Sequence, residues 1–552
     1  MSERPTFEIG LVMAGAISAG AYTAGALDFL IEALDAWDEA KARGDAEAPP
    51  HDVRLKVIAG ASAGGICAAI AAVALGRDFA HVSAGNLGSA SNPFFKPWVE
   101  DIDISVLLDN GDLEDDEAQV LSILNATGLP RIVDTVLDTA EPPKRRRYVA
   151  EPLPVRFTVG NLKGIPYEIG MRGNTAAGHA MRVHGDDYSF LVGAPPAGPP
   201  DPPVPPDWVA VTGGSSSGDP AWRKLGTACL ASGAFPLFLL PKALRRERHA
   251  LLDRRTFVIP GDGTNDPHHG TAREVEIEPT WPTPQPADPY DFLCVDGGTM
   301  NNEPLELARH VLAGGKLAHN PRAGKDATRA VLMIDPFVDP ADLGPGAGLP
   351  VTGLIGPLTD AWTMQCRFKP TDLVLAHEDD VYSRFLLAPS RGSAGPATRH
   401  PCASGGLGGF LGFFHRAFRE HDYLLGRRNC QRFLARHFAL PADNPLFAEW
   451  PQALKDALAI PDPAGPHLPV IPLLGSAGAV QPLPEWPSGR LDPKSLEPAI
   501  EARADKVFER LVAGLGTLQR WYVWAGWKFG ARSLVVDKAI GAVADAMKGQ
   551  KL

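Results

Sequence analysis

A strand-like run that ends in five small residues and continues as an apolar helix most constrains the fold of this chain. Residues 55–59 have the apolar character of a buried strand, and residues 66–75 have that of a buried helix. Gly60-Ala61-Ser62-Ala63-Gly64 lies between them. A sharp strand-to-helix turn needs small flanking residues, because a larger side chain would collide with the strand or the helix. The sequence therefore predicts an α/β unit with Ser62 at the tip of the turn.

The order of elements before this turn predicts a parallel sheet. Residues 7–13 form a short apolar run suited to a buried strand, and residues 14–20 form a loop of small residues. A helix with one apolar face follows, and the strand before Ser62 comes next. This order implies a right-handed crossover and a sheet covered on both faces. We expect an α/β fold, a three-layer sandwich around a mainly parallel central sheet.

The remaining chain is divided by its composition. We expect a first domain that contains an acidic and polar insertion or cap and a Pro/Gly-rich loop, followed by a mainly helical C-terminal region with a proline-rich linker. No strand is expected beyond Asp335. The expected bounds are 1–340 for the first domain, 76–154 for its insertion, 195–220 for its loop, 341–552 for the C-terminal region and 461–487 for the linker.

The charge and cysteine content limit the classes of function. The 552 residues carry a formal net charge of -12, which argues against nucleic acid as a partner, because a phosphate backbone requires a basic surface. The six cysteines show no metal-binding or disulfide spacing, so we expect neither a metal nor a cofactor and place the protein in the cytoplasm. The uncharged stretch 9–27 is rich in Gly, Ala, Ser and Thr and follows no basic cluster, so no signal peptide or membrane span is expected.

Ser62 is a candidate nucleophile. At the tip of such a turn its hydroxyl stands clear of the backbone, and the N-terminus of the following helix favours developing negative charge. A turn rich in Ala and Gly before a packed helix would give the same pattern without any chemistry. The five residues alone leave both interpretations open.

Asp296 is the candidate partner for Ser62. It ends the apolar run 292–295 and precedes Gly297 and Gly298, which places its carboxylate at the carboxyl edge of the sheet, where open α/β sheets keep their active sites. A turn residue in an Asp-Gly pair is the alternative. Downstream histidines, such as His310 and His400, lie in a helix and a Gly/Pro-rich loop without a sequence signature of a catalytic base.

Taken together, the motifs resemble the patatin-like phospholipase family, in a bacterial-type variant. The resemblance covers roughly the first 340 residues. The motifs occur in this order: residues 13–22 (MAGAISAGAY), the turn at Ser62, residues 161–164 (NLKG), residues 231–236 (ASGAFP), and residues 295–298 (VDGG) continuing into 301–304 (NNEP).

This resemblance implies a serine hydrolase that cleaves a carboxylic ester of a lipid, like a phospholipase A, a lysophospholipase or a lipid esterase. Asp296 would accept the proton of Ser62 and later activate the water that hydrolyses the acyl-enzyme. The motif glycines would be Gly60, Gly64, Gly297 and Gly298.

The oxyanion hole implied by the resemblance consists of backbone N–H groups of Gly15, Ala16 and Ile17, with Ala63 as a further donor. The loop departs from the pattern of many relatives, because alanine replaces a glycine and no Lys or Arg follows. Alanine restricts positive φ, and the missing cation leaves open whether phospholipids or neutral acyl esters are preferred.

Three apolar stretches, 237–240, 408–414 and 521–527, are candidates for peripheral contact with a membrane, and core packing is the alternative for each.

Two other functions stay open. One is a histidine-dependent α/β-hydrolase or thioesterase, and the other is a catalytically weak lipid-binding protein on the same fold.

Overall fold

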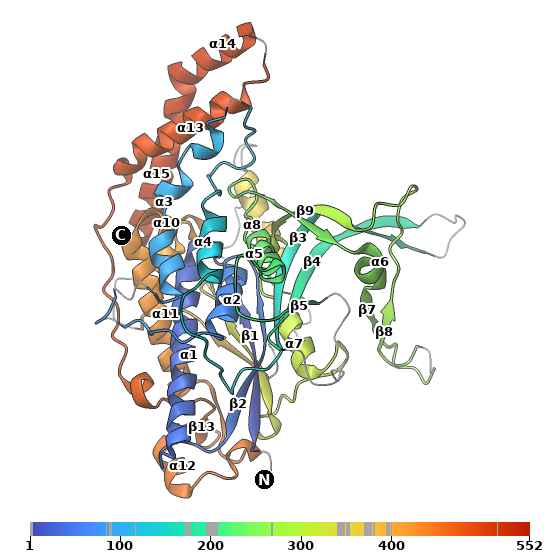
Figure 1. The fold of residues 1–552 in the computed structure, drawn as a ribbon, viewed down its shortest axis with the longest axis vertical. Helices are drawn as coiled ribbons and strands as arrows, with labels where there is room; N and C mark the ends of the chain where they lie inside the picture. The colour runs from blue at the N-terminus through green and yellow to red at the C-terminus, as the bar shows by residue number, and fades with distance from the viewer. Residues whose placement is uncertain are drawn as a thin grey trace.

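The computed structural model shows a mixed, mostly parallel sheet with helices packed on it (Figure 1). It describes the chain from Arg4 onward with internal gaps. The residues left out are 1–3, 84, 88–90, 116, 172–177, 195–207, 267–268, 339–347, 349–353, 369–377, 379–380, 393–397, 399 and 516.

The described residues form a central sheet of nine strands. The order along the main path is β11-β10-β1-β2-β3-β4-β5, and β9 pairs with β3 and β6. All pairs are parallel except β3–β4, β3–β9 and β6–β9. The expected α/β fold with a mainly parallel sheet is confirmed. The strands are β1 (Thr6–Met13), β2 (Asp52–Gly60), β3 (Leu153–Ile169), β4 (His179–Val192), β5 (Val209–Val211), β6 (Lys242–Arg246), β9 (Tyr290–Asp296), β10 (Arg329–Ile334) and β11 (Arg384–Leu387).

Helices cover both faces of the sheet. On one face, α1 (Gly20–Arg43), α2 (Ala63–Ala74) and α5 (Pro220–Ser232) contribute to the largest hydrophobic core. On the other face, α7 (Leu305–Ala313) packs Ala308 and Leu312 against apolar residues of β1, β2 and β10. The helical stretch Ile17–Arg43 is long and apolar enough to cross a membrane, but 94% of its most apolar window is buried inside the fold.

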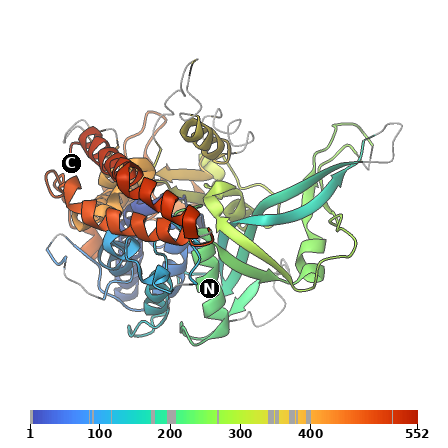
Figure 2. The ribbon, with the colours of Figure 1, turned by 90° about the horizontal axis from the view of Figure 1, so that it is seen from above.

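A long antiparallel ribbon projects from this body. The outer halves of β3 and β4 extend beyond the sheet beside α6 (Arg248–Leu251) and the hairpin of β7 (Thr256–Ile259) and β8 (Arg273–Glu276) (Figures 1 and 2). Half of the predicted Pro/Gly-rich loop at 195–220, residues 195–207, lies outside the described residues, and the other half contains β5.

The C-terminal region contributes to the sheet and to its helical layer. The expectation of no strand beyond Asp335 is wrong, because β11 extends the sheet in parallel beside β10. Its four residues, Arg-Phe-Leu-Leu, are too few to show a strand period in sequence. The helix α11 (Arg416–Arg436) packs along α1, and Gly25 and Gly426 allow the two backbones to approach closely. A Cβ atom on Gly25 would lie 1.9 Å from the carbonyl oxygen of Tyr423.

The last helices extend away from the sheet beyond the carboxyl ends of β1 and β2 (Figure 1). They are α13 (Glu497–Leu511), α14 (Thr517–Gly526) and α15 (Arg532–Gln550). The α13 helix is tied to the predicted insertion 76–154, because Arg503 forms an ion pair with Asp112 and donates to the carbonyl oxygen of Ile123. The predicted linker 461–487 is mostly irregular and contains β13 (His467–Pro469), which pairs with β12 (Ala439–Pro441).

A buried ion cluster joins α1 to α11. The guanidinium group of Arg427 contacts the carboxylates of Asp28 and Glu32, and all three side chains are buried. Burial by itself would raise the pKa of Asp28, but Arg427 and a hydrogen bond with His81 hold that pKa at about 2. The cluster therefore keeps the carboxylate of Asp28 charged inside the fold.

Replacing Arg427 with methionine should destabilise the protein, because it leaves Asp28 and Glu32 buried without their cation. We expect the free energy of unfolding at pH 7 to fall by about 3–5 kcal/mol, measured by urea denaturation. Arg432→Met, an exposed arginine on the same helix, is the matched control and should change this quantity by less than about 0.5 kcal/mol. Equal losses in the two variants would contradict a stabilising role for the cluster.

Candidate active site

The turn between β2 and α2 has the geometry of a nucleophile elbow. Ser62 has φ 54° and ψ −126°, a backbone conformation that non-glycine residues rarely adopt. The flanking glycines are required by close contact: a Cβ atom on Gly60 would lie 2.3 Å from the carbonyl oxygen of Gly64, and one on Gly64 would lie 2.2 Å from that of Met13. The Ser62 N–H donates to the buried hydroxyl of Ser232 at 3.0 Å, which anchors the strained residue.

The structure brings Ser62 and Asp296 together. The Ser62 Oγ donates a hydrogen bond of 2.5 Å to Asp296 Oδ2. The other carboxylate oxygen, Oδ1, accepts the N–H of Gly298 at 2.7 Å, and the Asp296 N–H donates to the carbonyl oxygen of Ala234. A Cβ atom on Gly297 would lie 2.0 Å from the Thr158 carbonyl oxygen, so this predicted glycine is required where β9 leaves β3. The two side chains that the resemblance pairs thus lie at hydrogen-bond distance in the structure.

Burial sets the proton affinity of Asp296. The residue is 2% exposed, and desolvation raises its pKa to about 7 against the opposing hydrogen bonds from Ser62 and Gly298. Removing a carboxylate from water penalises its charged form, which makes it a stronger base than an exposed aspartate. A carboxyl group with this pKa can exchange a proton near neutral pH.

The candidate histidines are engaged elsewhere. The imidazole of His310 on α7 lies 3.2 Å from the carboxylate of Glu306, and the ring of His400 packs against Phe337. Within the part of the chain that the structure describes, the carboxylate of Asp296 is the hydrogen-bond acceptor of the Ser62 hydroxyl. The geometry thus favours the carboxylate over an imidazole as the base.

The predicted oxyanion loop lies beside the nucleophile, with one correction. A Cβ atom on Gly15 would be only 3.0 Å from Ser62 Cβ, but the Gly15 N–H already donates to the carbonyl oxygen of Asn302 at 3.2 Å. Gly15 therefore does not offer a free donor. Among the described residues, the N–H groups of Ala16, Ile17 and Ala63 make no hydrogen bond within the protein. Ala63 begins α2, where N–H groups have no partner inside the helix.

The backbone of the oxyanion loop is held in an unusual conformation. Ile17 has φ 49°, which is strained for a β-branched residue. Ser18 braces the next turn, because its hydroxyl donates to the carbonyl oxygen of Gly409 and accepts the N–H of Gly412 at 3.0 Å. The segment after residue 400 therefore supports the loop in front of Ser62.

A polar network behind Gly15 was not predicted from the sequence. Asn302 forms two hydrogen bonds with the backbone of Gly15. The backbone carbonyl of Asn302 accepts the Gly15 N–H, and its side-chain Nδ2 donates to the Gly15 carbonyl at 3.3 Å. The same Nδ2 contacts Glu303, and Arg367 forms ion pairs of 2.8 Å with Glu303 and Asp335. The NNEP motif singled out residues 301–304 in the sequence but indicated no role for them. No sequence signal indicated Arg367, because it is far in sequence from Glu303 and Gly15.

Two of the predicted apolar stretches meet beside the site. The rings of Phe235 and Phe238, next to the residues that contact Asp296, pack against Phe410 at centroid distances of 5.6 and 5.4 Å. Leu237 between them is 74% exposed. The third stretch, 521–527, lies on α14 and the turn after it, where Trp527 stacks on Phe508 and Trp524 is exposed.

The described residues contain no group of three or more His, Cys, Asp or Glu side chains arranged to hold a metal ion. The candidate site thus consists of a strained serine, a buried carboxylate of raised pKa and backbone donors, with an apolar surface at its side. This set is suited to nucleophilic attack on a carbonyl carbon.

The chain was compared with known proteins. No protein-family model matches it. An uncharacterized protein of Sinorhizobium fredii, y4iI, is 35% identical over 555 aligned positions that cover 92% of this chain and 77% of the relative. This chain therefore belongs to the same family as the uncharacterized y4iI protein of Sinorhizobium fredii.

Proposed function

We propose that this protein is a serine acyl hydrolase of lipid esters that works through a Ser62–Asp296 dyad, in the manner of patatin-like phospholipases. The observation that carries this proposal is the hydrogen bond from Ser62 Oγ, at a strained strand-to-helix turn, to a buried carboxylate with a pKa of about 7. Nucleophile and base already lie at hydrogen-bond distance, the arrangement that covalent catalysis by serine requires.

In the proposed reaction, Ser62 Oγ attacks the ester carbonyl carbon while its proton passes to Asp296. The carbonyl oxygen becomes an oxyanion that accepts hydrogen bonds from the N–H groups of Ala16, Ile17 and Ala63. Collapse of this intermediate breaks the bond to the alcohol, which leaves with the proton from Asp296, and the acyl group stays on Ser62. Water then attacks the acyl carbonyl, gives its proton to Asp296 and releases the carboxylic acid as Ser62 recovers its proton.

The apolar surroundings support a lipid substrate. Phe235, Phe238 and Phe410 form an aromatic surface next to the residues that hold Asp296. Such a surface favours a hydrocarbon chain over a polar acyl group. The oxyanion loop has no cation, so the proposal includes both phospholipids and neutral acyl esters.

Peripheral contact with a lipid surface is part of the proposal. Exposed Leu237 accepts a backbone hydrogen bond from Ile123, itself exposed, and Ile123 is held in turn by Arg503 of α13. The apolar rim beside the site thus reaches α13, and Trp524 is exposed on α14, the next helix along the chain. Exposed aromatic and aliphatic side chains favour the interface of a membrane. The cytoplasmic location stays a prediction.

Ser62→Ala and Asp296→Asn should each lower kcat/KM for p-nitrophenyl acyl esters by at least about a thousandfold, because each removes one member of the dyad. Asp291→Asn, on the exposed side of β9, is the matched control and should keep wild-type activity. A fluorophosphonate probe should label the wild type and not Ser62→Ala. Near-normal turnover by Asp296→Asn would favour a histidine-dependent hydrolase, and a folded wild type without labelling would favour a lipid-binding protein.

The pH dependence should report Asp296. A general base must be ionised, and with a pKa of about 7 its ionised fraction falls as the pH is lowered. We expect kcat/KM to reach a plateau above about pH 8 and to fall about tenfold per unit below about pH 6. Rates should be measured at constant ionic strength, with return to pH 8 as the check for reversibility. An inflection near pH 4 would contradict a buried base.

The raised pKa of Asp296 also predicts how the Asp296→Asn substitution changes the stability of the protein. A carboxyl group whose pKa is raised by folding stabilises the native state fully below about pH 4, and this contribution is lost as the pH rises through about 7. Asp296→Asn should therefore have a higher Tm than the wild type at pH 8. A lower Tm at pH 8 would show that the substitution disturbs the site.

Asn302→Ala should lower kcat by about ten- to a hundredfold with KM little changed, because Asn302 holds the loop that supplies the oxyanion donors. The neighbouring substitution Asn301→Ala is the control and should stay within about threefold of the wild type. Equal effects of both substitutions on kcat, or an effect of Asn302→Ala on KM alone, would contradict this positioning role.

A further inference from the structure

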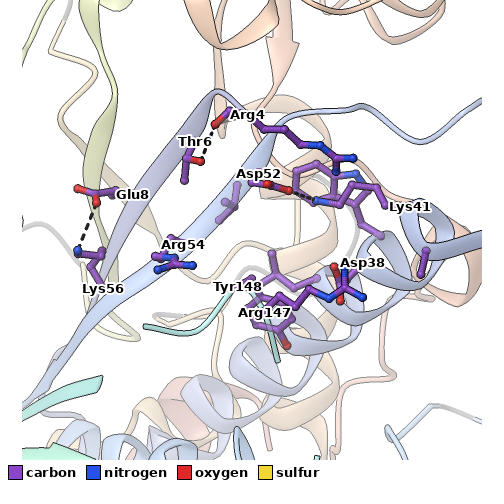
Figure 3. Close-up of a pocket in the computed structure, with 14 residues that line it drawn as sticks. Arg4, Thr6, Glu8, Asp38, Lys41, Asp52, Arg54, Lys56, Arg147 and Tyr148 are labelled. Carbon is purple, nitrogen blue, oxygen red and sulfur yellow. Dashed lines mark hydrogen bonds and ion pairs between the residues drawn. The ribbon is translucent and has the colours of Figure 1, made fainter. Parts of the chain in front are cut away.

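A cavity lies at the end of the sheet opposite to Ser62. It measures about 790 Å³ and opens where β1 and β2 begin, whereas Ser62 follows the carboxyl end of β2 (Figure 3). The later part of α1 and the residues before β3 form its other walls. Its buried floor includes Trp37 and Tyr148. The charged residues that line it are Arg4, Glu8, Asp38, Lys41, Asp52, Arg54, Lys56 and Arg147.

Half of these eight charged side chains neutralise each other. Lys41 Nζ lies 2.6 Å from a carboxylate oxygen of Asp52, and Lys56 Nζ lies 3.4 Å from one of Glu8 (Figure 3). The other four are three arginines and Asp38. Across the described chain, the guanidinium groups of these three arginines form no ion pair or side-chain hydrogen bond. They are Arg4, Arg54 and Arg147.

These unpaired guanidinium groups contrast with their neighbours. Arg145 forms an ion pair with Glu151 at 2.8 Å, and Arg146 forms one with Asp35 at 2.9 Å. These two arginines directly precede Arg147 in the sequence, and each pairs with a carboxylate. Carboxylates outnumber basic side chains in this chain of net charge -12, so partners for ion pairs with arginine are not scarce. Three cations that line one cavity without partners therefore create a local positive potential against the charge of the whole protein.

The charge of the cavity indicates the charge of its ligand. Three guanidinium groups against the carboxylate of Asp38 leave a net charge of two positive units, after the two ion pairs are set aside. A phosphate monoester carries about −1.5 to −2 at pH 7 and offers three acceptor oxygens. Guanidinium groups bind such oxygens through paired, charge-assisted hydrogen bonds.

We propose that this cavity binds a phosphate monoester, with the phosphate held by Arg147 and Arg4. Val53 and Leu55 face α1, so Arg54 points to the other face of β2 and contributes through its charge. The cavity is larger than a phosphate group and has room for the molecule that carries it. The phosphate monoester is either a soluble phosphorylated compound or the headgroup of phosphatidic acid, since both present the same dianion. The proposal is independent of hydrolysis at Ser62, because the two sites lie at opposite ends of β2.

Calorimetry with glycerol 3-phosphate tests the soluble form, and cosedimentation with phosphatidylcholine vesicles, with and without phosphatidic acid, tests the lipid form. We expect saturable binding in at least one of these two experiments, the soluble arm or the lipid arm. Arg147→Gln and Arg4→Gln should each raise Kd about fivefold or more, because each removes a charge-assisted contact with the phosphate. Ser62→Ala should bind like the wild type. Binding should also weaken below about pH 6, where the phosphate takes up a proton.

Arg145→Gln is the matched control, because Arg145 lies two residues before Arg147, is highly exposed and does not line the cavity. Its Kd should stay within about twofold of the wild type. The arginine variants change exposed side chains, and circular dichroism melting curves verify that all the variants fold. Absence of binding in both arms overturns the proposal. Equal weakening by Arg145→Gln overturns it as well, since that result would indicate attraction by the general surface charge.

Discussion

The contact between Gly60 and the backbone of Gly64 is the constraint on which the rest of the site depends. Only residues without a Cβ atom allow β2 to turn into α2 within three residues, and this turn forces Ser62 into a backbone conformation of positive φ. Two hydrogen bonds from Ser62 to residues outside the turn stabilise this strained conformation. The Ser62 N–H donates to the hydroxyl of Ser232, and Ser62 Oγ donates to the carboxylate of Asp296. Nucleophile, base and helix N-terminus thus share one rigid junction at the carboxyl edge of the sheet.

The oxyanion loop depends on segments that are remote in sequence. Asn302 holds Gly15, Arg367 joins Glu303 to Asp335, and Ser18 is seated between Gly409 and Gly412. The loop itself is short and contains alanines, so its conformation is not maintained by its own residues. The C-terminal region therefore contributes to the site through contacts with the loop, and α11 fastens this region to α1 through Arg427. The proposed active site thus depends on segments from most of the chain.

Prediction from the sequence succeeded where local patterns carry the signal. The apolar run 55–59, the small residues around Ser62 and the Asp-Gly-Gly turn after a strand each have a local steric reason, so the sheet class and the placement of Ser62 and Asp296 at strand ends could be predicted. The pairing of the two side chains was implied by the resemblance to patatin-like phospholipases. The strand β11 could not, because four residues carry too little periodicity. Gly15 was expected to donate to an oxyanion, but Asn302 occupies its N–H, and a contact between residues so far apart in sequence has no local signature. The same holds for Arg367.

The sequence by itself determined which residues can occupy strained or crowded backbone positions, because the presence or absence of a Cβ atom is a property of each residue. It also placed Ser62 and Asp296 at the ends of strands. Only the tertiary structure decided that Asp296 is desolvated enough to have a pKa of about 7, which backbone donors remain free, and that three unpaired arginines line one cavity. Burial, free hydrogen-bond donors and local potential all depend on which distant segments pack around a group, and these are set when the chain folds.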